Sequence, residues 1–120
     1  MRPARAIARF TVVHRRLRLR VRLLPTVRDV DAEYREGRRR RDGRYVHAFF
    51  TPALAPAAHV GTVVLPADGR LAELVPHEVV HAVMHQQEHA HFSIDERLAT
   101  AVGLLTARIL DRLQRLGMEV

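Results

Sequence analysis

The chain lacks cysteine, lysine and asparagine, and no long apolar run interrupts its polar residues. Without cysteine, disulfides and thiolate zinc ligands are both excluded, and this fits a reducing compartment. No apolar stretch reaches the roughly 20 residues that a membrane-spanning helix needs. Arg9 breaks the apolar part of the N-terminal segment, so that segment does not read as a signal peptide. We expect a cytoplasmic protein with no membrane partner.

Acidic residues are fewer than basic ones. The chain has 20 basic residues, all of them arginine, and 13 acidic residues. A GC-rich genome would favour arginine codons over lysine codons, but it would not produce the net charge of +7. The excess of base over acid indicates a nucleic acid or an acidic protein surface as a partner. The length of 120 residues and the 48% hydrophobic content fit one domain over 1–120, with 1–9 as a flexible tail.

Three segments are typical of β-strands, at residues 16–23, 44–51 and 59–65. The first alternates strictly between arginine and an aliphatic residue, which predicts one face in the core and one in water. The arginine face is either a surface that binds polyanions or a solvated outer face that resists aggregation. The run Arg38, Arg39, Arg40 and Arg41 poses the same choice between a nucleic-acid contact and an ordinary exposed loop.

Three helices are expected around these strands. Thr26 is a candidate N-cap for a short helix up to residue 36, with Gly37 ending it. A second helix begins either near residues 68–71 or at Pro76, a favoured first position, and runs to about residue 89. A third helix follows residue 95, with apolar residues spaced by three and four and Gly117 as its C-cap. The fold class is α+β, with a small antiparallel or mixed sheet of about three strands packed against the last two helices.

The central motif of the sequence is His77-Glu78-Val79-Val80-His81, the pattern His-Glu-x-x-His. On a helix, residues four apart lie on the same face, so both imidazoles can reach one metal ion. Glu78 is turned by about 100° from His77, where its carboxylate can take a proton from a water that the metal acidifies. The motif therefore predicts a hydrolytic Zn²⁺ site with Glu78 as general base.

A zinc site needs at least one further protein ligand. Met84 and Gln87 stand where the metzincin pattern needs glycine and histidine, so that branch is excluded. Glu96, near the start of the last helix, is the candidate for a site of the gluzincin type. Ser93 and Glu96 also form a capping-box pattern, in which Glu96 would only close its own helix. Asp95 or a histidine remains the alternative ligand.

Other residues near the motif are assigned to supporting roles. His85 continues the series from His81 by one more helical turn, so it can lie beside the metal or act as an alternative ligand. A peptide substrate would add to an exposed strand by main-chain pairing, and we expect Val60, Gly61, Thr62 and Val63 to form that strand.

These residues carry a resemblance. His77-Glu78-Val79-Val80-His81-Ala82, followed by Glu96-Arg97-Leu98-Ala99, resembles the small zincin-like proteins encoded by phages and prophages, and more distantly the ImmA/IrrE-type gluzincin metallopeptidases. The match covers roughly residues 59–110. The resemblance implies a compact domain with His77, His81 and Glu96 as zinc ligands, Glu78 as base and proton shuttle, and an edge strand that holds an extended peptide.

The function expected from the sequence is thus a zinc-dependent metallopeptidase, phage- or prophage-encoded, acting on a peptide or protein. A first alternative is a catalytically silent basic module, stabilised by zinc, that binds nucleic acid or a phage or host protein. A second alternative is a domain without metal, in which the histidines are only polar helix positions.

Overall fold

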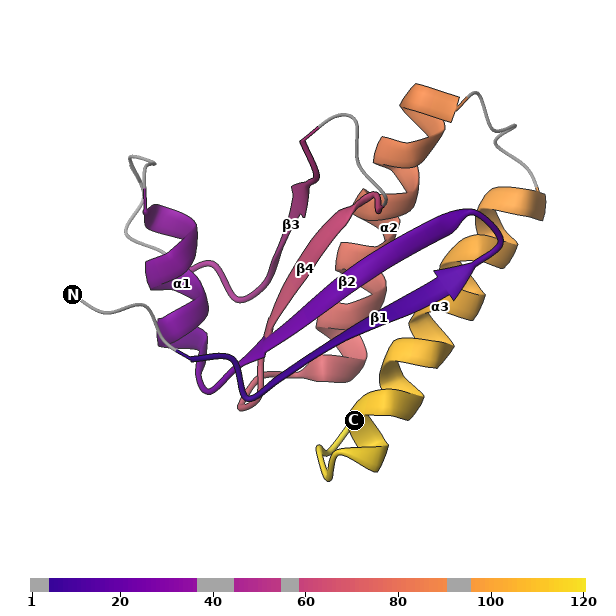
Figure 1. Ribbon diagram of the computed structural model, residues 1–120. Helices are drawn as coiled ribbons and strands as arrows, with labels where there is room; N and C mark the ends of the chain where they lie inside the picture. Colours follow the sequence, from indigo (N-terminus) through magenta and orange to yellow (C-terminus); the bar gives the residue numbers. More distant parts are fainter. Residues whose placement is uncertain (1–4, 37–44, 55–58, 91–95) are drawn as a thin grey trace.

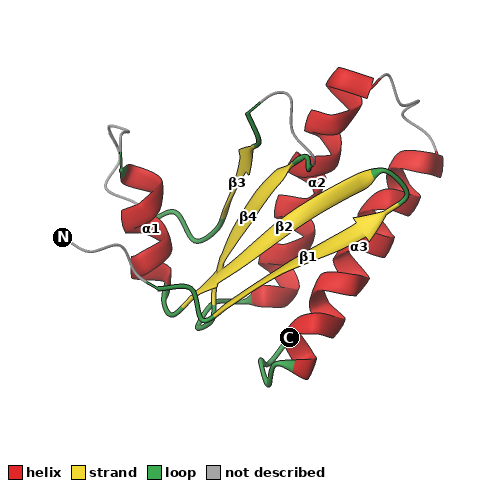
Figure 2. Cartoon of the chain, in the orientation of Figure 1, coloured by secondary structure: helices red, strands yellow, loops and turns green. Residues whose placement is uncertain are grey.

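The computed structural model describes residues 5–36, 45–54, 59–90 and 96–120, and it describes only the backbone of 87–90 and 96. Within these residues it shows an α+β fold, a mixed four-stranded sheet with three helices (Figures 1 and 2). The strand order is β1-β2-β4-β3. The elements are β1 (Ala8–His14), β2 (Leu17–Leu24), α1 (Val27–Arg35), β3 (Phe49–Pro52), β4 (Gly61–Pro66), α2 (Leu71–Ala90) and α3 (Glu96–Arg115).

The sheet joins an N-terminal hairpin to a pair of strands from the middle of the chain. β1 and β2 pair antiparallel, β2 and β4 pair parallel, and β3 pairs antiparallel with β4. α1 lies in the connection between β2 and the strands that follow it. β4 is therefore hydrogen-bonded on both sides, and β3 lies at one end of the strand order.

The fourth strand, β1, was not among the predicted strands, and it begins inside the predicted tail. Ala8 and Arg9 pair with Leu23 and Arg22, and the amide of Ile7 already donates to the carbonyl of Leu23 at 2.7 Å. The tail prediction is wrong from this point because the turn after His14 folds the segment back along β2. Residues 1–4 lie outside the described part of the chain.

The alternation of β2 is confirmed. Leu19, Val21 and Leu23 are fully buried, whereas Arg18 and Arg20 are exposed on the opposite face. The outer face is partly covered by α1, whose Glu33 accepts a hydrogen bond from Nη1 of Arg22 at 2.6 Å.

The helices lie on opposite faces of the sheet. α2 packs on β3 and β4, α3 packs beside α2 and on β1, and α1 lies on the other face against β2 and β4 (Figure 1). Side chains of the sheet, α2 and α3 form the main core, and a smaller cluster lies under α1. The fully buried aliphatic residues at the centre of the main core are Leu19, Leu23, Val63, Leu65, Val75, Val79, Leu105, Ile109 and Leu113.

Two of the predicted capping residues, Thr26 and Gly117, account for helix ends in the described residues. The Thr26 side chain accepts from the amide of Asp29, and the Asp29 carboxylate accepts from the amide of Thr26, so the N-cap of α1 is a capping box. Gly117 adopts φ of 88° and ends α3 with a hydrogen bond from the amide of Met118 to the carbonyl of Leu113, at 3.0 Å. Gly37 lies outside the described residues.

Of the two predicted starts for the motif helix, the earlier one is confirmed, because α2 begins at Leu71 and contains Pro76. Proline has no amide hydrogen, so the carbonyl of Ala72 gains no helical donor from it. Ala72 is exposed, and water can supply the donor instead. Among the described helices, none is both long enough and apolar enough to cross a membrane.

Candidate metal centre and groove

α2 places the two histidines of the motif on one face, directed at the same point. The Nε2 atoms of His77 and His81 are 3.2 Å apart, and the two rings meet edge to face with centroids 4.9 Å apart. Both residues are exposed, and their Nε2 atoms lie at hydrogen-bond distance from one another. The local cause is the period of the helix, which stacks residues four apart.

This spacing fits a shared zinc ion. Two nitrogens that each lie 2.0–2.1 Å from a tetrahedral ion are about 3.3 Å from one another. The observed 3.2 Å between the Nε2 atoms matches that edge of a tetrahedron. Imidazole nitrogen is also among the ligands that zinc takes most often.

Glu78 differs from its two neighbours in being buried, with 5% of its surface exposed. Its Oε2 lies 4.0 Å from Nε2 of His77, so the carboxylate is next to the histidine pair without standing between the two rings. Burial raises the pKa of Glu78, while the adjacent His77 and His81 act in the opposite direction. A carboxylate with a raised pKa beside a candidate metal position has the properties that a general base needs.

The histidine pair and Glu78 open into a groove of about 490 Å³ between α2 and β3. α1 contributes Tyr34 to the wall, and α2 contributes Met84 and His85. The side of β3 and the segment before it is lined by Val46, Ala48, Phe49, Phe50 and Pro52. The His85 and Phe50 rings pack with centroids 5.8 Å apart, which joins the helix to the strand at the groove floor. An open groove with apolar side chains along β3 and polar side chains along α2 can hold an extended peptide.

The strand expected to hold the substrate is misassigned in the sequence-based prediction. Val60 and the β4 residues Gly61, Thr62 and Val63 are already engaged, because β4 pairs with β2 on one side and with β3 on the other. The amide of Val60 donates to Arg18, and its carbonyl accepts from Ala53. The strand beside the histidine pair that has only one strand neighbour among the described residues is β3.

The structure explains why glycine occupies position 61. Its φ is 154°, and a Cβ added there would lie 2.3 Å from the carbonyl oxygen of Thr51 and 2.7 Å from the ring of Phe50. Glycine therefore permits β3 to lie close to β4, and it keeps the Phe50 ring at the groove.

The candidates for a third metal ligand lie at or beyond the border of the described residues. Within the part of the chain that the structure describes, no group of three or more histidines, aspartates or glutamates is arranged to hold a metal ion. His85 lines the same groove but does not complete such a group with His77 and His81. Glu96 is the first residue of α3 and its side chain is not described, whereas Asp95 lies outside the described residues. The donor atoms that can be tested fit zinc. The first described turn of α3, at Arg97 and Leu98, lies on the other side of α2 from the histidine pair.

The predicted basic surface is partly described. Arg18 and Arg20 belong to β2, which pairs with β1. Their side chains lie on the outer face of the sheet, away from α2 and the groove. Arg38, Arg39, Arg40 and Arg41 lie outside the described residues.

The sequence analysis identified His77, Glu78, His81 and His85 but none of the other residues that line the groove, which are Tyr34, Val46, Ala48, Phe49, Phe50, Pro52 and Met84. Proline inside a strand is a signal of an edge strand, but β3 and β4 both end in proline, at Pro52 and Pro66. That signal could not separate the two strands.

No protein-family model, curated protein or solved structure matches the chain. The functional argument therefore depends on the geometry of α2, β3 and the groove between them.

Proposed function

We propose that the protein is a zinc-dependent metallopeptidase that cleaves an extended peptide lying along β3. The observation that carries the proposal is the 3.2 Å separation of the His77 and His81 Nε2 atoms beside the buried carboxylate of Glu78. A solvated pair of polar helix residues would not require a buried carboxylate next to it, since burying an acid costs free energy unless hydrogen bonds or a charged partner compensate it.

His77 and His81 would hold the ion, and Glu96 or Asp95 would add a carboxylate ligand. When bound, zinc supplies Lewis acidity that polarises the scissile carbonyl and makes water nucleophilic at neutral pH. Glu78 accepts the proton of the attacking water at a carboxylate oxygen and returns it to the leaving amine. The low exposure of Glu78 strengthens this exchange, because few waters compete for its oxygens.

β3 supports the choice of a peptide as substrate. It contacts α2 and lines the groove that contains the histidine pair, and it pairs with another strand only through β4 among the described residues. A strand with a free side can hold a peptide by main-chain hydrogen bonds, and the apolar wall around Phe50 gives space for its side chains. The aromatic and aliphatic side chains along β3 favour an apolar substrate residue near the cleaved bond.

The test compares wild type with Glu78→Gln, after loading with zinc, on a mixture of internally quenched peptides. We expect Glu78→Gln to lose at least about 100-fold in cleavage rate, in line with the contribution of a general base. Zinc content by elemental analysis should be unchanged, since Glu78 is not a proposed ligand. The matched variant His81→Ala should lose both zinc and activity.

Cleavage that is equal in wild type and Glu78→Gln would contradict the proposal. Zinc bound at one ion per chain with no cleavage of any peptide would instead favour a silent module with zinc as a structural element. The exposed arginines Arg18 and Arg20 would then be the place to look for an acidic partner.

A further inference from the structure

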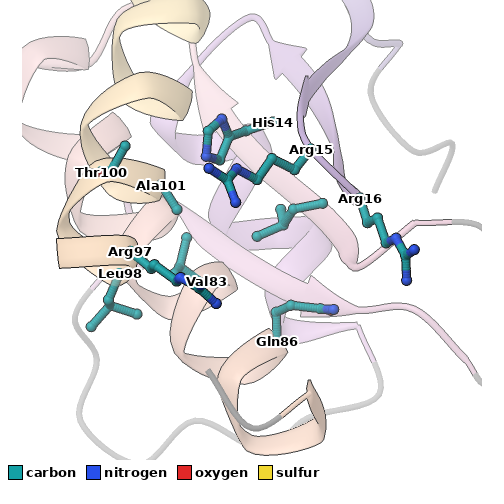
Figure 3. A pocket seen from close by; sticks show the side chains of 10 residues that line it. His14, Arg15, Arg16, Val83, Gln86, Arg97, Leu98, Thr100 and Ala101 are labelled. Atoms are coloured by element: carbon teal, nitrogen blue, oxygen red, sulfur yellow. The ribbon is translucent and has the colours of Figure 1, made fainter. Parts of the chain in front are cut away.

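A second cavity lies on the other side of α2 from the groove. Its volume is about 550 Å³, and it is enclosed by the β1–β2 turn, the second half of α2 and the first turns of α3 (Figure 3). On α2 it is lined by Val83 and Gln86, whereas the groove is lined by His77, His81 and His85. The two cavities therefore use different faces of one helix.

The cavity combines a cationic rim with an apolar floor. Three arginines, Arg15, Arg16 and Arg97, and one histidine, His14, belong to its lining, and no acidic side chain does among the residues described. Figure 3 shows Arg15 and Arg97 extending toward the same space from the hairpin and from α3. The apolar part consists of Leu17, Val83, Leu98 and Ala101.

The hairpin turn carries arginine where the backbone favours another residue. His14 pairs with Leu17, so Arg15 and Arg16 form a two-residue turn, and Arg15 adopts φ of 56°. Such turns need a positive φ, for which glycine, asparagine and aspartate are the usual residues. An arginine there costs free energy, so its side chain must contribute something that the turn itself does not need. Its position at the cavity rim supplies such a contribution.

The surroundings of His14 also indicate a positive potential at the rim. Burial lowers the pKa of His14, and the guanidinium groups of Arg108 and Arg15 lower it further. The same potential that disfavours a proton on this imidazole favours an anion close by.

We propose that this cavity binds a small carboxylate with an apolar tail, such as a medium-chain fatty acid. The guanidinium group of Arg15 would hold the carboxylate, and the tail would lie on Leu17, Val83 and Leu98. The cavity volume is in the range of small-molecule sites, and a nucleic acid would not use its apolar floor. This inference does not depend on peptidase activity or on zinc.

The probe is octanoate, titrated into the full-length chain by isothermal titration calorimetry. Octanol has the same tail without the charge, and acetate has the charge without the tail. We expect octanoate to bind at one site per chain, with octanol and acetate each at least about tenfold weaker, because charge-assisted hydrogen bonds and apolar burial both contribute. Octanol binding as tightly as octanoate, or no octanoate binding at millimolar concentration, would overturn the proposal.

The decisive variant is Arg15→Gly, because glycine accepts a positive φ without strain. Octanoate binding should weaken about tenfold through loss of one charge-assisted contact, while the melting temperature stays the same or rises. Arg20→Gln, an exposed arginine on the outer sheet face, is the matched control and should bind octanoate like wild type. Unchanged binding in Arg15→Gly, or an equal loss in Arg20→Gln, would show that the cavity is not the site.

Discussion

At the scale of single residues, Glu78 is a position where stability conflicts with the proposed role as general base. A helix that only needed to pack would place an apolar side chain at a position with 5% exposure. Glu78 instead keeps a carboxylate there, and burial raises its pKa. The residue is therefore a source of instability in the metal-free protein at neutral pH, where the buried group has to ionise.

Replacing Glu78 by glutamine should reverse this cost in a pH-dependent manner. The folded state binds the Glu78 proton more tightly than the unfolded state, so wild type loses stability as pH rises above the ordinary pKa of 4.5. That loss is complete above the folded-state pKa and absent below the ordinary value. In metal-free protein we expect Glu78→Gln to melt higher than wild type at about pH 8, with the difference shrinking toward about pH 4. Thermal melts at several pH values measure this, and a difference that grows as pH falls would contradict it.

At the scale of elements, the groove depends on how closely β3 approaches β4. Gly61 makes that approach possible, because any side chain there would collide with Thr51 and Phe50 of β3. Phe50 in turn packs on His85 of α2. A change at Gly61 is therefore transmitted to the groove wall through two contacts.

Gly61→Ala should destabilise the fold by about 2–3 kcal/mol, since it combines an unfavourable φ with a clash against backbone. Gly103→Ala is the matched control, because Gly103 lies in α3, is exposed, and has open space where its Cβ would be. That change should stabilise by about 0.5–1 kcal/mol through helix propensity. Urea unfolding measures both, and a Gly61→Ala protein as stable as wild type would mean that β3 is held away from β4.

Local signals in the sequence were enough to predict most elements and the convergence of the histidine pair, His77 and His81. The alternation of Arg18 to Leu23 gave β2 and its buried face, Thr26 and Gly117 gave helix ends, and the His77–His81 spacing gave the converging imidazoles. Each of these depends on residues a few positions apart. The order of strands does not, because the parallel pairing of β2 with β4 joins segments about 40 residues apart and shows no local trace in the sequence. The edge position of β3 could not be predicted for that reason.

At the scale of the whole molecule, a bound metal would connect α2 to α3. His77 and His81 lie on one helix, and the candidate carboxylate Glu96 begins the next, which packs beside it. Binding to the folded state alone stabilises it by about 2.7 kcal/mol at a zinc concentration 100 times Kd. Such a link would act on both 20-residue helices, α2 and α3, at once.

Zinc should therefore raise the melting temperature of wild type, and a chelator should reverse the rise. Glu96→Ala should remove most of the zinc-dependent rise, because the histidine pair alone is an incomplete site. Glu119→Ala, an exposed carboxylate near the C-terminus, should leave it intact. If Glu96→Ala keeps the full rise, the third ligand is another residue, with Asp95 the next to replace.

The two edge strands of the sheet, β1 and β3, differ in how free they are to pair with a strand of another chain. β1 is packed against α3, whose Arg108 donates to the carbonyl of Val13 and whose Arg112 lies 5.3 Å over the ring of Phe10. β3 is short, and α2 runs beside it. If only one edge of a sheet is free, a single strand can be added there and growth then stops. A sheet that is open at both edges can grow into a fibre. Self-association through β3 would consequently end at a closed pair of chains, and each such pair would occupy the place where a substrate peptide has to lie.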